Sequence, residues 1–175
     1  MDYLSFIKNK WVVFLCFLII TFGLYGQSLS GEFVFDDRNI VENIEMLSNI
    51  TYVDHIFMHP FWSTDNGLYR PITLLSYSFN LIFFGAGPAS FHFINLILYT
   101  LVCFLIYLFI KKLFKKDLLA FSTALIFLIL PIHSEVVANI SGRGELLALL
   151  FSLLALIETT KEKSKFWLIG LWFFL

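Results

Sequence analysis

Long apolar segments separated by short charged ones dominate the pattern of this chain. Residues 11–30 and 91–110 are each long enough to cross a bilayer as a helix, which takes about 20 residues. Residues 117–132 and 145–158 are shorter, but the lysines at their ends can reach the polar interface, so we interpret them as spans as well. Residues 166–175 begin a fifth apolar segment. The pattern predicts an all-α membrane protein, built as a polytopic helical bundle.

The lysines indicate how these spans are oriented. If the spans alternate across the bilayer, all nine lysines, in three clusters, fall on one side, which the positive-inside rule assigns to the cytosol. The three arginines and four histidines then lie on or near the opposite face. We therefore expect a cytosolic N-terminus and outer loops at residues 31–90 and 133–144.

One helix is expected to lie along the membrane. Residues 71–84 begin with a proline, which suits a first helical turn, and are too short to cross the bilayer. Thr73, Ser76 and Asn80 recur at helical spacing on this otherwise apolar segment. A thin polar stripe of this kind predicts an amphipathic helix in the outer interface.

Composition excludes a water-soluble fold. Only 14% of the residues are charged and 59% are hydrophobic, whereas soluble domains carry about a quarter charged residues. The net charge of -1 gives no basic field that would attract a nucleic acid. Cys16 and Cys103 lie inside apolar segments, where a buried thiol is the ordinary interpretation. The interiors of the expected spans lack acids and bases, which disfavours a transporter.

The first candidate for chemistry is the pair Asp36 and Asp37, which follows the first span closely. Adjacent carboxylates near a low-dielectric boundary repel each other, so the pair can retain a proton above the usual pKa and serve as a general base. Two alternatives stay open. The pair can form a solvated turn in which Asp37 caps a helix, or it can contribute to a carboxylate site for a divalent cation.

Basic residues beside the membrane suggest phosphate recognition. Arg70 precedes the interfacial helix, where its planar fork can bind either a specific phosphate or bulk headgroups. The second outer loop gathers His133, Glu135, Arg143 and Glu145, and the glycines on both sides of Arg143 permit an anion-binding nest. Ordinary solvation of this loop is the alternative. His92 and Asn95 share one face of the long span, where His92 is either a ligand or a packing residue.

Four segments in order carry a family resemblance: FVFDDRNIVEN, YRPITLLSYSFN, GPASFHFINLILYTLV and LPIHSEVVANISGRGELLALL. Together they resemble the amino-terminal part of the transmembrane-and-tetratricopeptide O-mannosyltransferase-like proteins and their bacterial relatives, within the GT-C superfamily. The resemblance covers roughly residues 10–157. It implies transfer of a sugar from a polyprenyl-phosphate-linked donor to a hydroxyl of a protein or glycan acceptor, on the outer or lumenal face of the membrane.

The resemblance also implies roles for individual residues. The assigned residues are Asp36 and Asp37 as catalytic groups, Arg70, Arg143 and His133 as ligands of the donor phosphate, and His92, Asn95, Glu135 and Glu145 as supporting groups. No residue is assigned to a metal, although a divalent cation is compatible with the acidic pair.

The chain also departs from the family pattern. The family often has His-Pro-x-His at the second outer loop, whereas Leu130 precedes Pro131 here. The family also has more spans and a tetratricopeptide region, so we expect residues 1–175 to be a partial transmembrane domain that is inactive alone. The alternative is a non-catalytic membrane module. Frequent Phe, Ile, Lys and Asn favour a bacterial plasma membrane, with the endoplasmic reticulum as the alternative.

Overall fold

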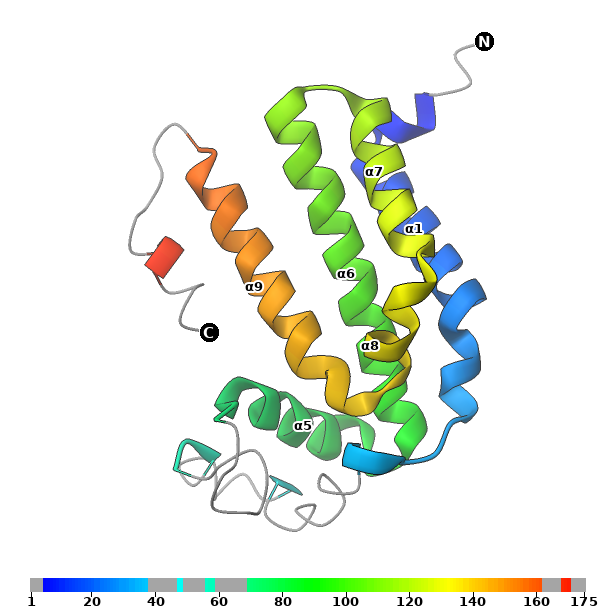
Figure 1. The fold of residues 1–175 in the computed structure, drawn as a ribbon, viewed down its shortest axis with the longest axis vertical. Helices are drawn as coiled ribbons and strands as arrows, with labels where there is room; N and C mark the ends of the chain where they lie inside the picture. The colour runs from blue at the N-terminus through cyan, green and yellow to red at the C-terminus, as the bar shows by residue number, and fades with distance from the viewer. Residues whose placement is uncertain (1–4, 38–46, 49–55, 59–68, 162–167, 171–175) are drawn as a thin grey trace.

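The computed structural model describes residues 5–37, 47–48, 56–58, 69–161 and 168–170, and every regular element in these parts is helical (Figure 1). The longer helices are α1 (Lys10–Tyr25), α5 (Pro71–Phe84), α6 (Pro88–Phe114), α7 (Asp117–Ile129) and α9 (Arg143–Thr159). The short ones are η1 (Ser5–Lys8), η2 (Gly26–Ser30), η3 (Phe35–Asp37), η5 (Pro131–His133), α8 (Ser134–Ala138) and η6 (Ile140–Gly142). The predicted all-α membrane bundle is confirmed.

Three of these segments are long and apolar enough to span a membrane. They are residues Lys10–Ser30, Pro88–Phe114 and Ile140–Thr159, and a fourth span results if α7 and the bent segment that follows are counted together. Of the fifth expected span, residues 166–175, only 168–170 are described, and they are helical. Most of the acidic outer loop, from residue 38 to residue 68, also lies outside the described residues.

Helix α6 is the centre of the bundle and packs against α1, α7 and α9. Phe17 of α1, Tyr107 of α6 and Leu128 of α7 are fully buried in this core. Ala120 and Ala124 of α7 are also fully buried, and their small side chains allow the helices to approach closely. Large apolar side chains are exposed on the outside of α1, α7 and α9, where lipid would surround the bundle in a membrane.

The lysine clusters meet at one end of the bundle. The Lys111 ammonium donates to the Lys8 carbonyl (3.4 Å) and also pairs with Asp117 (2.7 Å). Lys112 donates to the Ile157 carbonyl (3.4 Å), near the end of α9. The start of α1, the end of α6 and the end of α9 therefore share one face of the molecule, as expected from the alternation of the spans.

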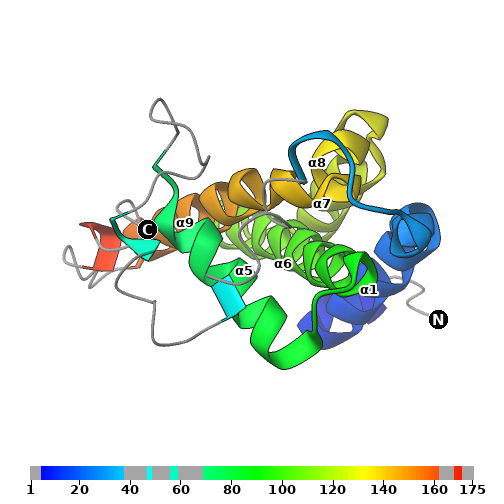
Figure 2. The same ribbon diagram turned by 90° about the horizontal axis from the view of Figure 1, so that it is seen from below.

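Helix α5 crosses the opposite end of the bundle, beneath α6 and α9 (Figure 2). Pro71 occupies its first turn, and Gly85, with φ of +85°, ends it in a conformation that favours glycine. In a simple interfacial helix the polar stripe would face water. In α5 it faces the bundle instead, because Thr73 and Asn80 are buried. The side chains that α5 exposes are apolar, with Phe79 and Phe83 among them.

Candidate functional site

The two neighbouring aspartates of η3 have different environments. The side chain of Asp37 is fully buried, whereas Asp36 is exposed. Asp37 Oδ1 accepts a hydrogen bond from the Ser141 backbone N–H (2.9 Å), and Oδ2 accepts one from the Val34 N–H (3.3 Å). Burial raises the pKa of the Asp37 carboxyl above its usual value, while these backbone donors and the nearby His92 oppose the rise. The main cause is therefore desolvation, not the repulsion between neighbours that the sequence suggested.

The Ser141 N–H that binds Asp37 belongs to η6, a turn fixed from several sides. Tyr77 of α5 donates its hydroxyl to the Ile140 carbonyl (3.1 Å), and burial raises the pKa of this phenol, which keeps it a neutral donor. Asn95 of α6 donates to the Asn139 carbonyl (3.0 Å). The anion that this glycine-flanked turn binds is thus a carboxylate of the protein itself.

Close approach of two backbones explains the glycine of this turn. A Cβ atom on Gly142 would lie 2.4 Å from the Val136 carbonyl oxygen, much too close for any side chain. Gly142 therefore allows η6 to fold back against α8. The requirement is steric, because Gly142 has an ordinary helical φ of -62°.

Arg143 begins α9 and is fully buried. Its Nε donates to Asn95 Oδ1 (2.8 Å), and its Nη1 donates to the Ser76 carbonyl (3.2 Å). Its Nη2 donates to Asn80 Oδ1 (3.0 Å) and to the Phe91 carbonyl (2.9 Å). A guanidinium has five N–H donors, so these four hydrogen bonds occupy most of them. The arrangement makes Arg143 an anchor that joins α5, α6 and α9.

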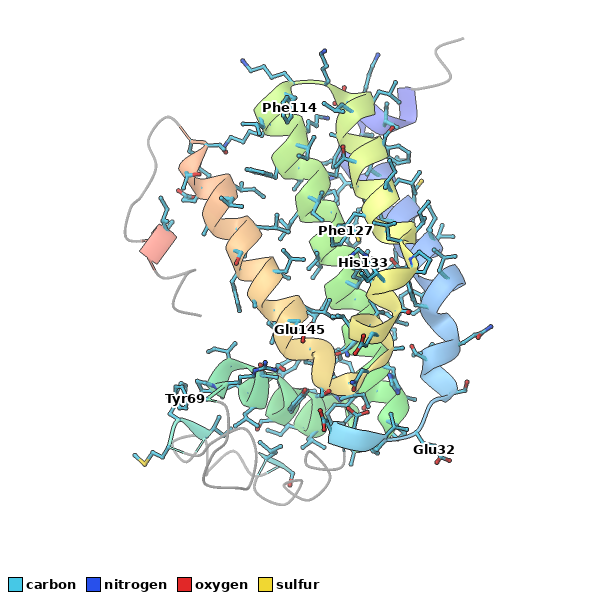
Figure 3. The ribbon with its side chains drawn as sticks, viewed as in Figure 1. Glu32, Tyr69, Phe114, Phe127, His133 and Glu145 are labelled. Carbon is cyan, nitrogen blue, oxygen red and sulfur yellow. The ribbon has the colours of Figure 1, made fainter. Side chains whose placement is uncertain are left out.

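Arg70 lies where α5 meets the start of α9. A Cβ atom on Gly144 would lie 3.2 Å from Arg70 Nη1 and 3.2 Å from the Thr73 hydroxyl oxygen. The missing side chain of Gly144 therefore makes room for the guanidinium of Arg70. Glu145, next along the chain, is exposed in the first turn of α9 (Figure 3).

His92 is buried in the first turns of α6, with 2% of its surface exposed. A Cβ atom on Gly31 would lie 3.1 Å from its Nε2. Within the described residues, neither ring nitrogen has a hydrogen-bond partner. His92 thus lies beside the η2–η3 segment, close enough to Asp37 for their charges to interact.

His133 lies at the break between α7 and α8, and its hydrogen bonds go to the bundle. Its Nδ1 is 2.8 Å from the Phe127 carbonyl oxygen and 3.1 Å from the Tyr99 hydroxyl. Glu135, in the first turn of α8, is exposed. The structure therefore brings Asp37, Arg70, Arg143, His92 and Asn95 around α5 and η6, whereas His133 contacts another set of groups.

Sequence reasoning missed Tyr77 and the backbone N–H of Ser141. A tyrosine in an apolar helix gives no sign of its hydroxyl's partner, and a backbone donor has no signature in the sequence. No three His, Cys, Asp or Glu side chains cluster as metal ligands in the described parts of the chain.

Comparison with known proteins identifies relatives. The chain is 43% identical over 142 residues to mouse protein O-mannosyl-transferase TMTC1 and 42% identical over 146 residues to the human protein. It is 34% identical over 149 residues to protein O-mannosyl-transferase F38B6.6 of Caenorhabditis elegans. These alignments cover 77%, 79% and 80% of this chain.

The aligned region covers 15%, 17% and 22% of the three relatives, so the chain spans only a small part of their length. No family model matches the chain, and no solved structure matches it significantly. The chain is therefore similar, over 77–80% of its length, to part of several protein O-mannosyl-transferases, TMTC1 and TMTC3 among them.

Proposed function

We propose that this chain carries part of the active site of a membrane glycosyltransferase. The reaction is transfer of a sugar from a polyprenyl-phosphate-linked donor to a hydroxyl of a protein or glycan acceptor, on the outer or lumenal face. The names of the relatives support O-mannosyl transfer to protein. The lipid-linked donor is part of the proposal, and it is supported by the resemblance and by the place of the site at one end of a membrane bundle.

One observation carries this proposal: an acidic and a basic residue both lie near the start of α9. Asp37 binds the Ser141 N–H (2.9 Å), which holds Asp36 at this end of the bundle. Arg70 approaches Gly144, three residues after Ser141. In a displacement reaction, a carboxylate can accept the proton of the attacking hydroxyl and a nearby guanidinium can stabilise the leaving phosphate.

The proposed mechanism is direct displacement. The exposed carboxylate of Asp36 accepts the proton of the acceptor hydroxyl while the hydroxyl oxygen attacks the anomeric carbon of the sugar. The bond from that carbon to the phosphate oxygen breaks, and the lipid phosphate leaves with the electron pair. Arg70 offsets the negative charge that develops on the phosphate.

The hydrogen bonds of the other expected residues support different roles. The four bonds of Arg143 within the protein favour an anchor over a phosphate ligand. The two backbone donors on Asp37 favour a residue that positions Asp36. His92, Asn95, Glu135 and Glu145 stay supporting residues in this proposal. A divalent cation, the cytosolic N-terminus and the choice between bacterial plasma membrane and endoplasmic reticulum stay predictions.

The test uses carboxylate-to-amide substitutions in the full-length protein, with labelled mannose on a polyprenyl phosphate as donor. We expect Asp36→Asn to lower transfer by about a hundredfold or more, because a general base contributes about that much. Asp37→Asn should cost about tenfold, since an amide oxygen can still accept one of the two backbone N–H bonds. The matched control is Glu32→Gln, which removes an exposed carboxylate at the same end of the bundle and should leave transfer unchanged.

Membrane insertion of each variant is checked in two ways. The protein should be extracted from membranes only by detergent, and it should then elute as a single species in size-exclusion chromatography. Unchanged transfer in the Asp36→Asn, Asp37→Asn double variant would remove the proposed base. The non-catalytic membrane module would then be the better interpretation.

A further inference from the structure

The fourth apolar segment is broken in a way that leaves a backbone acceptor without its helical donor. The axes of α7 and the segment Pro131–Ala138 differ in direction by 55°. Pro131 has no N–H, so the carbonyl of Phe127, four residues earlier, cannot make its helical hydrogen bond. In an apolar environment an unsatisfied carbonyl is costly, and side chains must replace the missing donor.

Three side chains from three parts of the chain supply replacements. The Tyr25 hydroxyl donates to the Leu128 carbonyl (3.0 Å). The Tyr99 hydroxyl lies 3.1 Å from the carbonyl oxygens of both Phe127 and Leu128. His133 Nδ1 lies 2.8 Å from the Phe127 carbonyl oxygen. The bend is therefore held by α1, α6 and the first turn after the break.

The distance from His133 Nδ1 to the Phe127 carbonyl oxygen indicates which nitrogen of the imidazole carries the proton. A carbonyl oxygen can only accept, so a nitrogen 2.8 Å from it must present an N–H. A bare Nδ1 at that distance would set two lone pairs against each other. The His133 ring also lies on the Phe127 ring, with centroids 4.1 Å apart, which fixes its orientation (Figure 3). Nδ1 also lies 3.1 Å from the Tyr99 hydroxyl, but the shorter contact with the carbonyl oxygen favours a proton on Nδ1 and leaves the Tyr99 hydroxyl to donate to one of the two carbonyls.

We propose that His133 is a positioning residue whose Nδ1–H replaces the donor that Pro131 lacks. This hydrogen bond stabilises the bend. From the bend the chain continues through α8 and η6 to Ser141, whose N–H donates to Asp37 (2.9 Å). His133 therefore acts on the candidate site through the backbone. Its effect on sugar transfer rests on the proposed function, whereas its hydrogen bond does not.

The first experiment measures the tautomer directly and needs no activity. Histidine labelled with ¹³C and ¹⁵N is incorporated into the full chain in detergent or lipid, and the signal that disappears in His133→Asn identifies His133. The ring nitrogen and Cδ2 shifts distinguish the two tautomers. A proton on Nδ1 is expected, although free imidazole in water favours the other nitrogen. A bare Nδ1 on His133 would overturn the proposal.

The second experiment uses two amides that imitate different ring nitrogens. The amide nitrogen of His133→Asn occupies roughly the position of Nδ1, whereas that of His133→Gln reaches toward Nε2. We expect His133→Asn to retain transfer within about threefold, and His133→Gln and His133→Ala to lower kcat by about tenfold, the effect of one lost hydrogen bond. The KM for the lipid-linked donor should stay unchanged, because His133 does not bind the donor phosphate.

The matched control is Ile132→Ala, which changes an exposed residue (76%) at the same bend and should leave kcat unchanged. Two results would contradict the proposal and favour a role as phosphate ligand. One is higher transfer activity in His133→Gln than in His133→Asn, and the other is a raised KM for the lipid-linked donor. If the wild-type full-length protein shows no transfer, the proposed function fails, and the tautomer measurement still decides the role of His133.

Discussion

Individual residues of similar chemistry take different roles here because their surroundings differ. Asp36 and Asp37 are neighbours in η3, yet successive residues of a tight turn point about 120° apart, so one is exposed and the other is buried. Arg70 and Arg143 differ in the same way. Arg70 lies at a helix junction, whereas Arg143 is fully buried and bound on several sides.

Removal of the Arg143 guanidinium should destabilise the bundle strongly. Arg143→Met would leave four acceptors without their donor, namely Asn95 Oδ1, the Ser76 carbonyl, Asn80 Oδ1 and the Phe91 carbonyl. Unsatisfied buried groups cost about 1–3 kcal/mol each, so we expect a loss of at least about 3 kcal/mol in the free energy of unfolding.

Denaturant-induced unfolding in detergent measures this loss, with the exposed Lys116→Gln as the control for removal of a positive charge. Arg143→Lys keeps the charge but not the planar fork, and it should recover less than half of the loss. A stability of Arg143→Met equal to that of Lys116→Gln would refute the anchor.

At the scale of elements, short helices join the long ones to the site. The turn η6 links the bent segment to α9. It donates a hydrogen bond to Asp37 of η3 and accepts hydrogen bonds from side chains of α5 and α6. Its position depends on contact between its backbone and that of α8, which Gly142 allows. Helix α5 contributes a buried polar face to this junction and an exposed apolar face to its surroundings.

Gly142→Ala should displace η6 from α8. The added methyl carbon would lie 2.4 Å from the Val136 carbonyl oxygen, so the backbone must move. We expect a cost of about 1–3 kcal/mol in the free energy of unfolding, typical of overpacking, and a longer distance from Asp37 to Ser141.

The control is Gly23→Ala in α1, where an added Cβ has no neighbour within 4 Å, and this change should not lower stability. Unfolding of both variants in detergent is compared with the wild type. Equal stability of the two alanine variants would show that η6 does not need the close approach.

The whole molecule has two chemically different ends. The lysine clusters meet at the end that contains Phe114, and the candidate site lies at the end that contains Glu32, Tyr69 and Glu145 (Figure 3). Within the described residues, three candidate spans, or four with the bent pair, connect these ends. If lysines stay in the cytosol, the candidate site faces the outer or lumenal side.

Single cysteines test this orientation in sealed vesicles. With Cys16 and Cys103 replaced by alanine, Glu32→Cys and Glu145→Cys should react with a membrane-impermeant maleimide from the outer or lumenal side. Lys116→Cys should react only after the membrane is permeabilised. All three positions are exposed in the structure, so lack of reaction reports topology and not burial. Labelling of the Glu32 and Glu145 positions from opposite sides would contradict the bundle.

The sequence by itself determined the membrane class and most of the helices, because apolar length and charge position act locally. The prolines at 71 and 88 begin α5 and α6, and the apolar segments around them can only be satisfied as helices in lipid. The sequence also indicated several of the residues that lie together at one end of the bundle, whereas His133 contacts Phe127 and Tyr99 at the bend. Their individual roles stay predictions.

Only the tertiary structure decided how the polar side chains pair. Arg143 looked like a phosphate ligand because its sequence neighbours are glycines, but its partners are 48–67 residues away in α5 and α6. His133 bonds to a carbonyl that becomes available only where the helix bends. Such pairings depend on which helix faces come together, and hydrogen-bond partners distant in the chain leave no periodic trace in the sequence.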